Sequence, residues 1–104
     1  MRTVVPNRRR SEIVSFTHDG IHFNGQISYL PDGSPCEVFV DGGKPGTAVQ
    51  AVARDSAVAV SLALQFGTPI ETLCAAMTQD EQGIAAGPIG AFLDIVIQQE
   101  NKNG

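Results

Sequence analysis

The chain has 104 residues, a length that suffices for one domain and not for two. Its composition is 42% hydrophobic and 17% charged, with a mean hydropathy of +0.02. These values exclude a disordered tail, a collagen-like repeat and a disulfide-stapled scaffold. No apolar run approaches the roughly 20 residues of a membrane span, and no apolar leader follows the N-terminal arginines. With only two cysteines, we expect a cytoplasmic protein with reduced thiols and no membrane association.

Charge is unevenly distributed along the chain. The first ten residues carry four arginines and no acid: Arg2, Arg8, Arg9 and Arg10. The remaining 94 residues hold three basic groups against eleven acidic ones, a net charge of −8. We therefore expect residues 1–10 to form a flexible basic arm, with Arg8, Arg9 and Arg10 as candidate contacts for phosphate or a partner. An acidic body repels nucleic acid, so any contact with nucleic acid is expected through this arm alone.

The first half of the chain has the two-residue period of β-strands. Apolar and polar side chains alternate over 11–17, 21–29 and 36–40. Asp19-Gly20 is a dipeptide that favours a two-residue hairpin turn. Gly25 lies on the apolar side of the second run, where a missing side chain indicates a bulge or the close approach of a helix. These short, closely connected runs predict an antiparallel three-stranded meander.

The period changes to 3.6 residues after a glycine-rich connector. Thr47 and Gln50 form a capping-box pattern that predicts the start of a long helix, and Gly67 marks its end near Phe66. The polar positions of this helix make one narrow stripe: Gln50, Arg54, Ser61 and Gln65. We interpret this stripe as the solvent-facing side, and we expect the rest of the circumference to be buried by the sheet, the later helices or another subunit.

Two shorter helices follow, starting near Pro69 and Pro88, and the chain ends in a polar tail at 101–104. Strands are thus segregated from helices. The fold class is predicted to be α+β, a three-stranded antiparallel meander followed by three helices, the first long and largely buried. All of these elements belong to one domain over 11–100.

Asp55 is the exception within the long helix. It lies away from the polar stripe, among small and apolar side chains such as Ala51, Val52 and Ala59. We expect a carboxylate in this position to be buried and therefore paired, hydrogen-bonded or protonated. Bonds to loop amides and a role at a ligand or subunit contact both remain open.

The connector before the long helix has residue types that suit an anion. The candidate ligand-binding residues are Gly42, Gly43, Lys44, Gly46, Thr47 and Asp55. Backbone N–H groups at a helix N-terminus, with a lysine nearby, can bind phosphate. However, Pro45 and Gly46 interrupt the Gly-Lys-Ser/Thr order of a P-loop. A tight structural connector and a weak anion site are both compatible with this sequence.

The chain has four soft metal ligands: His18, His22, Cys36 and Cys74. Their spacing contains no Cys-x-x-Cys pair and no His-x-x-x-His on a helix, so we expect no zinc and no other cofactor. No nucleophile has a base and an orienting third group at a recognisable spacing. The sequence therefore predicts no catalytic residue; it favours a chain that is not an enzyme by itself and leaves the question of activity open.

Five segments carry a further pattern: Asp32-Gly33, 37–40, 43–46, Ser61 to Pro69, and Gly87-Pro88. Together they resemble the TSCPD domain, which lies toward the C-terminus of adenosylcobalamin-dependent ribonucleotide reductases and also occurs as short stand-alone proteins. The resemblance covers about residues 20–97, and the run Ser-Leu-Ala-Leu-Gln-Phe-Gly-Thr-Pro is its specific part. The Thr-Ser-Cys-Pro-Asp sequence that names the family is absent, and a reductase barrel cannot fit in this chain. The resemblance implies a fold and a link to deoxyribonucleotide synthesis, without the chemistry.

Two classes of function follow. In the first, the chain is a non-catalytic binding or regulatory module that acts in trans on a ribonucleotide reductase or another protein. In the second, it is a small-ligand protein for nucleotide or phosphate, or a remnant of a ribonucleoside-diphosphate reductase, with its site between 42–46 and Asp55. Contact of the arginine arm with nucleic acid is a third hypothesis. We expect a homodimer in each case, because three strands and two short helices barely cover so apolar a helix.

Overall fold

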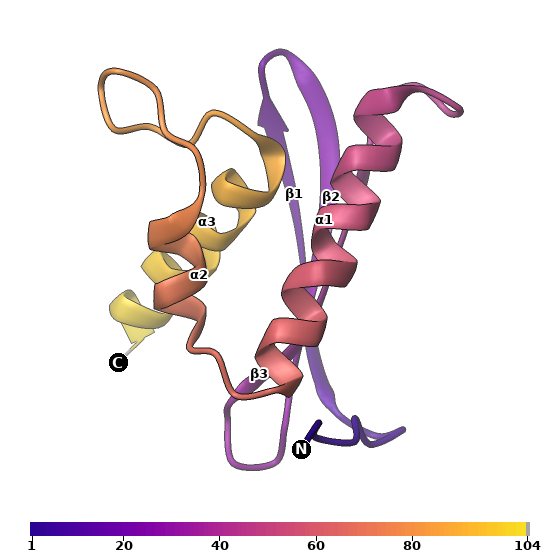
Figure 1. The fold of residues 1–104 in the computed structure, drawn as a ribbon, viewed down its shortest axis with the longest axis vertical. Helices are drawn as coiled ribbons and strands as arrows, with labels where there is room; N and C mark the ends of the chain where they lie inside the picture. Colours follow the sequence, from indigo (N-terminus) through magenta and orange to yellow (C-terminus); the bar gives the residue numbers. More distant parts are fainter. Residues whose placement is uncertain (104) are drawn as a thin grey trace.

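The computed structural model describes residues 1–103, and its architecture is α+β (Figure 1). Three strands come first: β1 (Arg10–His18), β2 (Ile21–Tyr29) and β3 (Pro35–Gly42). Three helices follow: α1 (Ala48–Gln65), α2 (Ile70–Ala76) and α3 (Pro88–Asn103). The predicted fold class is confirmed. The strand β1 begins at the last residue of the predicted arm, and α3 runs through 101–103 of the predicted tail, whose residue 104 lies outside the described residues.

The three strands form one antiparallel sheet in the order β1-β2-β3. Asp19 and Gly20 connect the first two strands with positive φ values of 53° and 74°, as a two-residue type I′ turn requires. Phe16 lies opposite Phe23 in the register, so their side chains share one face of the sheet. The strand β3 is left as an edge, with one row of backbone N–H and C=O groups that no other strand pairs.

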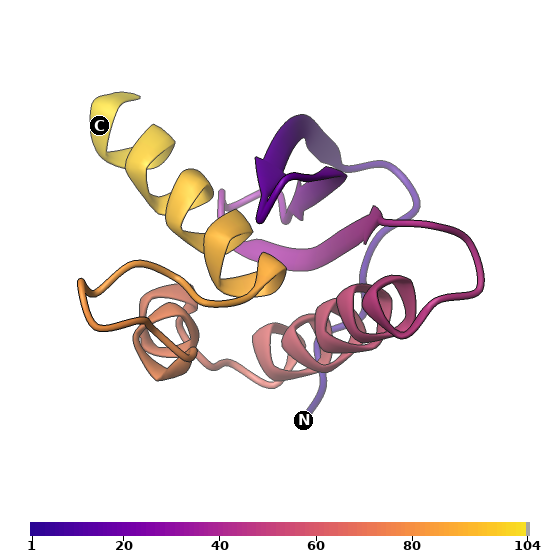
Figure 2. The same ribbon diagram turned by 90° about the horizontal axis from the view of Figure 1, so that it is seen from above.

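The hydrophobic core lies between one face of the sheet and the helices (Figure 2). The helix α1 runs along β3, and α3 lies beside α1. Phe16 stacks on Phe23 and on Phe92 of α3, with ring centroids 5.5 and 5.9 Å apart. Gly25 lies beneath the Phe92 ring, where an added Cβ would overlap the ring atoms. The predicted close approach of a helix at this glycine is confirmed. Among the described residues, no helix combines the length and apolar character needed to cross a membrane.

The ends of α1 have the chemistry that its sequence predicts. The Thr47 hydroxyl accepts a hydrogen bond from the Gln50 backbone N–H at 3.4 Å. At the other end Gly67 adopts a φ of 98°, and the N–H groups of Gly67 and Thr68 donate to the carbonyls of Leu64 and Ala63 at 3.0 Å. This pair of bonds is a Schellman motif, so the helix ends where glycine allows the left-handed turn.

Candidate functional site

Two polar side chains of α1 close the open edge of β3. The Ser61 hydroxyl accepts a hydrogen bond from the Val38 N–H at 2.9 Å and donates one to the Val38 carbonyl, also at 2.9 Å. One turn further on, the Gln65 amide donates to the Cys36 carbonyl at 3.0 Å. The helix thus supplies the edge strand with the hydrogen bonds that a fourth strand would have made.

This contact corrects the prediction that the polar stripe of α1 faces solvent. Ser61 and Gln65 are only 8% and 3% exposed, and they face the sheet. Arg54, on the same stripe, lies beside Asp41 with its Nε 3.4 Å from the carboxylate oxygen, and this pair is half-exposed. The helix is rotated about its axis relative to the predicted orientation. The Ser61 hydroxyl and the Gln65 amide can form hydrogen bonds with backbone groups of the edge strand, which no apolar side chain could do.

The opposite side of α1 is therefore apolar and exposed. We call this surface the α1 face; it consists of Ala48, Ala51, Val52, Asp55, Val58, Ala59, Leu62 and Phe66. Val52, Val58 and Phe66 are each about 60% exposed, and Leu62 is 39% exposed. The expected burial of α1 thus holds for the side that packs on the sheet. Neither α2 nor α3 covers the outward side (Figure 2).

The location of Asp55 is a second correction. Its side chain is exposed and lies near the middle of the α1 face, between apolar neighbours on the preceding and following turns. The expectation of a buried carboxylate is wrong because the helix presents this side to solvent. Asp55 is the one charged residue of the α1 face.

The N-terminal arm lies against the body at two places. Near the C-terminal end of α1, the Arg2 Nε donates to the Gln65 side chain at 2.5 Å, and the Thr3 N–H donates to the Gln65 carbonyl at 2.7 Å. Close to the sheet, Arg9 forms an ion pair with Glu37 at 2.9 Å. The arm is thus placed along the β3 side of the molecule, and β1 begins directly after Arg9.

The three consecutive arginines at the end of the arm line a hollow of about 370 Å³. We call it the arginine hollow; its lining includes Arg8, Arg9, Arg10, Tyr29, Leu30 and Pro31. The Arg10 guanidinium lies over the Tyr29 ring, 4.1 Å from its centroid. The sequence-predicted candidates Arg8, Arg9 and Arg10 therefore meet at one place.

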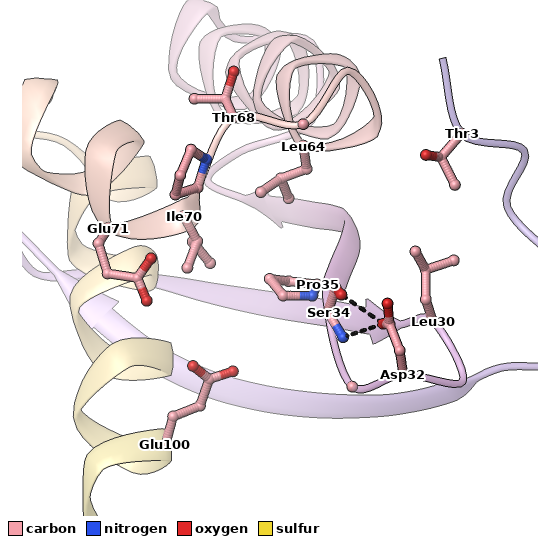
Figure 3. Close-up of a pocket in the computed structure, with 13 residues that line it drawn as sticks. Thr3, Leu30, Asp32, Ser34, Pro35, Leu64, Thr68, Ile70, Glu71 and Glu100 are labelled. Atoms are coloured by element: carbon pink, nitrogen blue, oxygen red, sulfur yellow. Dashed lines mark hydrogen bonds between the residues drawn. The ribbon is translucent and has the colours of Figure 1, made fainter. Parts of the chain in front are cut away.

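A second hollow, of about 500 Å³, lies between the β2–β3 loop, the α1–α2 junction and the end of α3. Glu71 and Glu100 lie on one side of this acidic hollow and Asp32 on the other (Figure 3). Asp32 accepts hydrogen bonds from the Ser34 N–H and hydroxyl, and these bonds lower the pKa of its carboxyl. Sequence reasoning missed this hollow. The sequence pattern that could have indicated it is the pair of TSCPD-like segments 32–33 and 67–69, which both contribute to the lining of this hollow.

The structure does not bring the connector and Asp55 together. Two N–H groups of the connector already have partners: Gly46 donates to the Gln50 side chain of α1 at 3.0 Å and Thr47 to the Lys44 carbonyl at 3.2 Å. Asp55 lies eight residues beyond Thr47, about 12 Å along the helix axis at ~1.5 Å per residue. Neither the acidic hollow nor the arginine hollow includes any residue of 42–47.

The two cysteines lie on different elements, and the pKa of each thiol is raised. Cys36 is buried, and burial raises the pKa of its thiol. The Cys74 thiol donates to the Asp94 carboxylate at 3.1 Å; burial and this neighbour raise its pKa to about 11. Within residues 1–103 no three His, Cys, Asp or Glu side chains are grouped as a metal site would need. The absence of a cofactor remains a prediction.

Comparisons with known proteins agree with the resemblance seen in the sequence. The model of the TSCPD domain matches residues 2–99. A curated relative, the vitamin B12-dependent ribonucleotide reductase of Agrobacterium fabrum (strain C58 / ATCC 33970), is 35% identical over 77 residues. The match covers 74% of this chain and 6% of the relative, so the chain spans a small part of that protein's length. No solved structure matches the chain.

Proposed function

The chain belongs to the TSCPD domain family, and we propose that it is a non-catalytic binding module that acts in trans on a vitamin B12-dependent ribonucleotide reductase. The α1 face carries this proposal. A soluble domain seldom exposes a continuous apolar surface unless a partner covers it. Here four large apolar side chains, Val52, Val58, Leu62 and Phe66, are 39% to 62% exposed on a single helix.

The residue spacing on the α1 face suits a helical partner. Val52, Ala59 and Phe66 are seven residues apart, and Asp55 and Leu62 lie between them at the same interval. These are the a and d positions of a heptad, which pack against another helix. Because Asp55 lies in this row, the proposed partner helix is apolar with a lysine or arginine opposite the carboxylate.

The choice of a reductase rests on the relative rather than on a site. In that protein the matching segment is part of a chain many times longer, and it is therefore held beside the rest of the reductase. A domain that acts in trans would recognise its partner by surface contact, for which an exposed apolar face is suited. Nucleotide reduction itself is not proposed for this chain.

The test measures binding of the full chain to purified adenosylcobalamin-dependent ribonucleotide reductase from the organism that encodes it. Val52→Lys and Val58→Lys place charges on two positions that are 60% and 58% exposed, so the fold should tolerate both. Losing the burial of one valine costs about 1.5 kcal/mol, or roughly tenfold in Kd. Ile13→Lys is the matched control, because Ile13 is 75% exposed on the other face of the sheet.

Weaker binding by both α1 variants, with unchanged binding by the Ile13 control, would support the proposal. Absence of binding by the unmodified chain, or equal binding by all variants, would contradict it. Sedimentation of each variant is measured in parallel, because a second copy of this chain is the alternative partner of the α1 face. A homodimer that the α1 variants dissociate, together with no affinity for the reductase, would replace the reductase by self-association.

A further inference from the structure

The arginine hollow is a feature that the α1 face does not explain. It lies where β1 begins and β2 ends, at the opposite end of the sheet from the 42–47 connector. Its positive charge comes from consecutive residues of the arm, whereas residues 11–104 carry a net charge of −8. The negative charge on the rest of the molecule repels anions. The cationic hollow is therefore the place at which an anion would be attracted.

The three arginines are held to different degrees. Arg9 is fixed by Glu37 at 2.9 Å and by the Pro6 carbonyl at 2.9 Å, and its buried Nε has no hydrogen-bond partner. Arg10 places its guanidinium carbon 4.1 Å from the centroid of the Tyr29 ring, a cation–π contact that does not consume its N–H donors. Within residues 1–103, neither Arg8 nor Arg10 takes part in an ion pair. Arg8 and Arg10 both line the hollow, and among the described residues neither guanidinium is neutralised by a carboxylate partner.

Apart from the arginines, the residues that line the hollow carry no charge: Tyr29, Leu30, Pro31 and Gly33. Burial, and then the nearby carboxylates of Glu12 and Glu100, raise the pKa of Tyr29 to about 12, so its phenol is neutral at physiological pH. Neither Glu12 nor Glu100 is among the residues that line the hollow. A long polyanion such as nucleic acid would extend from the hollow over the acidic body of the molecule, whereas a small anion would not.

We propose that the arginine hollow binds the phosphate groups of a small phosphorylated ligand, with Arg8 and Arg10 as its donors and Arg9 as the fixed wall. Planar guanidinium groups bind phosphate through paired, charge-assisted hydrogen bonds. A volume of about 370 Å³ is at the lower end of the range for ligand pockets and suits a diphosphate or triphosphate group. This inference is independent of the reductase proposal, since it uses a different surface.

The test is calorimetric titration of the full chain at low ionic strength with inorganic pyrophosphate and, separately, with ATP. The variant Arg8→Gln/Arg10→Gln keeps long polar side chains and removes both charges. We expect it to lower the affinity for either probe at least tenfold. Arg2→Gln is the matched control, because it removes one charge from the same arm at a residue that lies against Gln65. It should bind as the unmodified chain does.

Each outcome decides the matter. Absence of heat with both probes, or equal losses in the Arg2 control and the double variant, would overturn the proposal. Tighter binding of single-stranded oligonucleotides as their length increases would also overturn it in favour of nucleic-acid binding along the arm. If Arg10→Gln disturbs the fold, as thermal unfolding would reveal, the exposed Arg8→Gln variant alone must still lower affinity several-fold.

Discussion

The hydrogen bonds of Ser61 with Val38 make the stability of the edge strand open to direct measurement. Ser61→Ala removes both bonds and leaves the Val38 N–H and C=O without partners at a position where Ser61 is 8% exposed. An unsatisfied buried polar group costs about 1–3 kcal/mol, and alanine regains roughly 0.5 kcal/mol of helix propensity. Taking the lower end of this range for each of the two Val38 groups, the net loss should be about 2 kcal/mol.

For a domain of this size, about 2 kcal/mol corresponds to a fall in Tm of roughly 10 °C. The free energy of unfolding is measured by urea denaturation followed by far-UV circular dichroism, and Tm is measured by calorimetry. Ser56→Ala is the matched control, since the half-buried Ser56 hydroxyl donates only to the Ala53 carbonyl of its own helix at 3.0 Å. Its loss should change the unfolding free energy by less than about 0.5 kcal/mol.

Equal stability of the two alanine variants would contradict this prediction. In that case water, rather than Ser61, would satisfy the β3 edge, and the rotation of α1 would need another cause. A Ser61→Thr variant adds a check, because its hydroxyl can form both bonds while its methyl group must fit beside β3. It should retain more stability than Ser61→Ala.

Two further predictions concern the core and the response to alkaline pH. Gly25→Ala should destabilise the fold by about 1–3 kcal/mol, because the added methyl group meets the Phe92 ring. Adding Phe92→Leu to the same chain should recover part of this loss. No recovery in the double variant, measured by urea unfolding, would rule out this contact as the cause. The folded-state pKa values of Cys74 and Tyr29, about 11 and about 12, lie above their ordinary values of 9.0 and 10.0. Their protonated forms are therefore favoured by folding, and stability should be complete below about pH 9 and decline as pH rises through about 11 to 12. The slope should decrease in Cys74→Ala, and a flat profile above about pH 9 would refute the assignment.

The fold was predictable where sequence pattern and local chemistry agree. Alternation of apolar residues located the strands, Asp19-Gly20 located the hairpin, and Gly67 located the end of α1. The glycine at position 25 even indicated which strand a helix approaches. Each of these inferences depends on residues that are near one another in the chain or on a conformation that few residue types can adopt.

The orientation of α1 was not predictable by the same means. A helical wheel separates polar from apolar residues, but it assumes that polar residues face water. Ser61 and Gln65 instead face Val38 and Cys36, residues more than 20 positions away in the chain. The backbone of an edge strand leaves no mark in the hydrophobic pattern, so its demand for polar partners becomes visible only in three dimensions. The mistaken prediction that Asp55 is buried follows from the same assumption that polar residues of a helix face water.

The same interaction explains why the α1 face remains exposed. Turning the helix to bury Val58 and Leu62 against the sheet would carry Ser61 and Gln65 away from β3 and leave its edge groups unpaired. The fold therefore cannot cover this apolar surface by a rotation of its own helix; α3 packs on the sheet beside α1, and α2 packs against α3 (Figure 2). A fold that uses the polar side of its longest helix to protect an edge strand leaves the apolar side for a partner. The proposed binding function is thus consistent with how the chain stabilises itself.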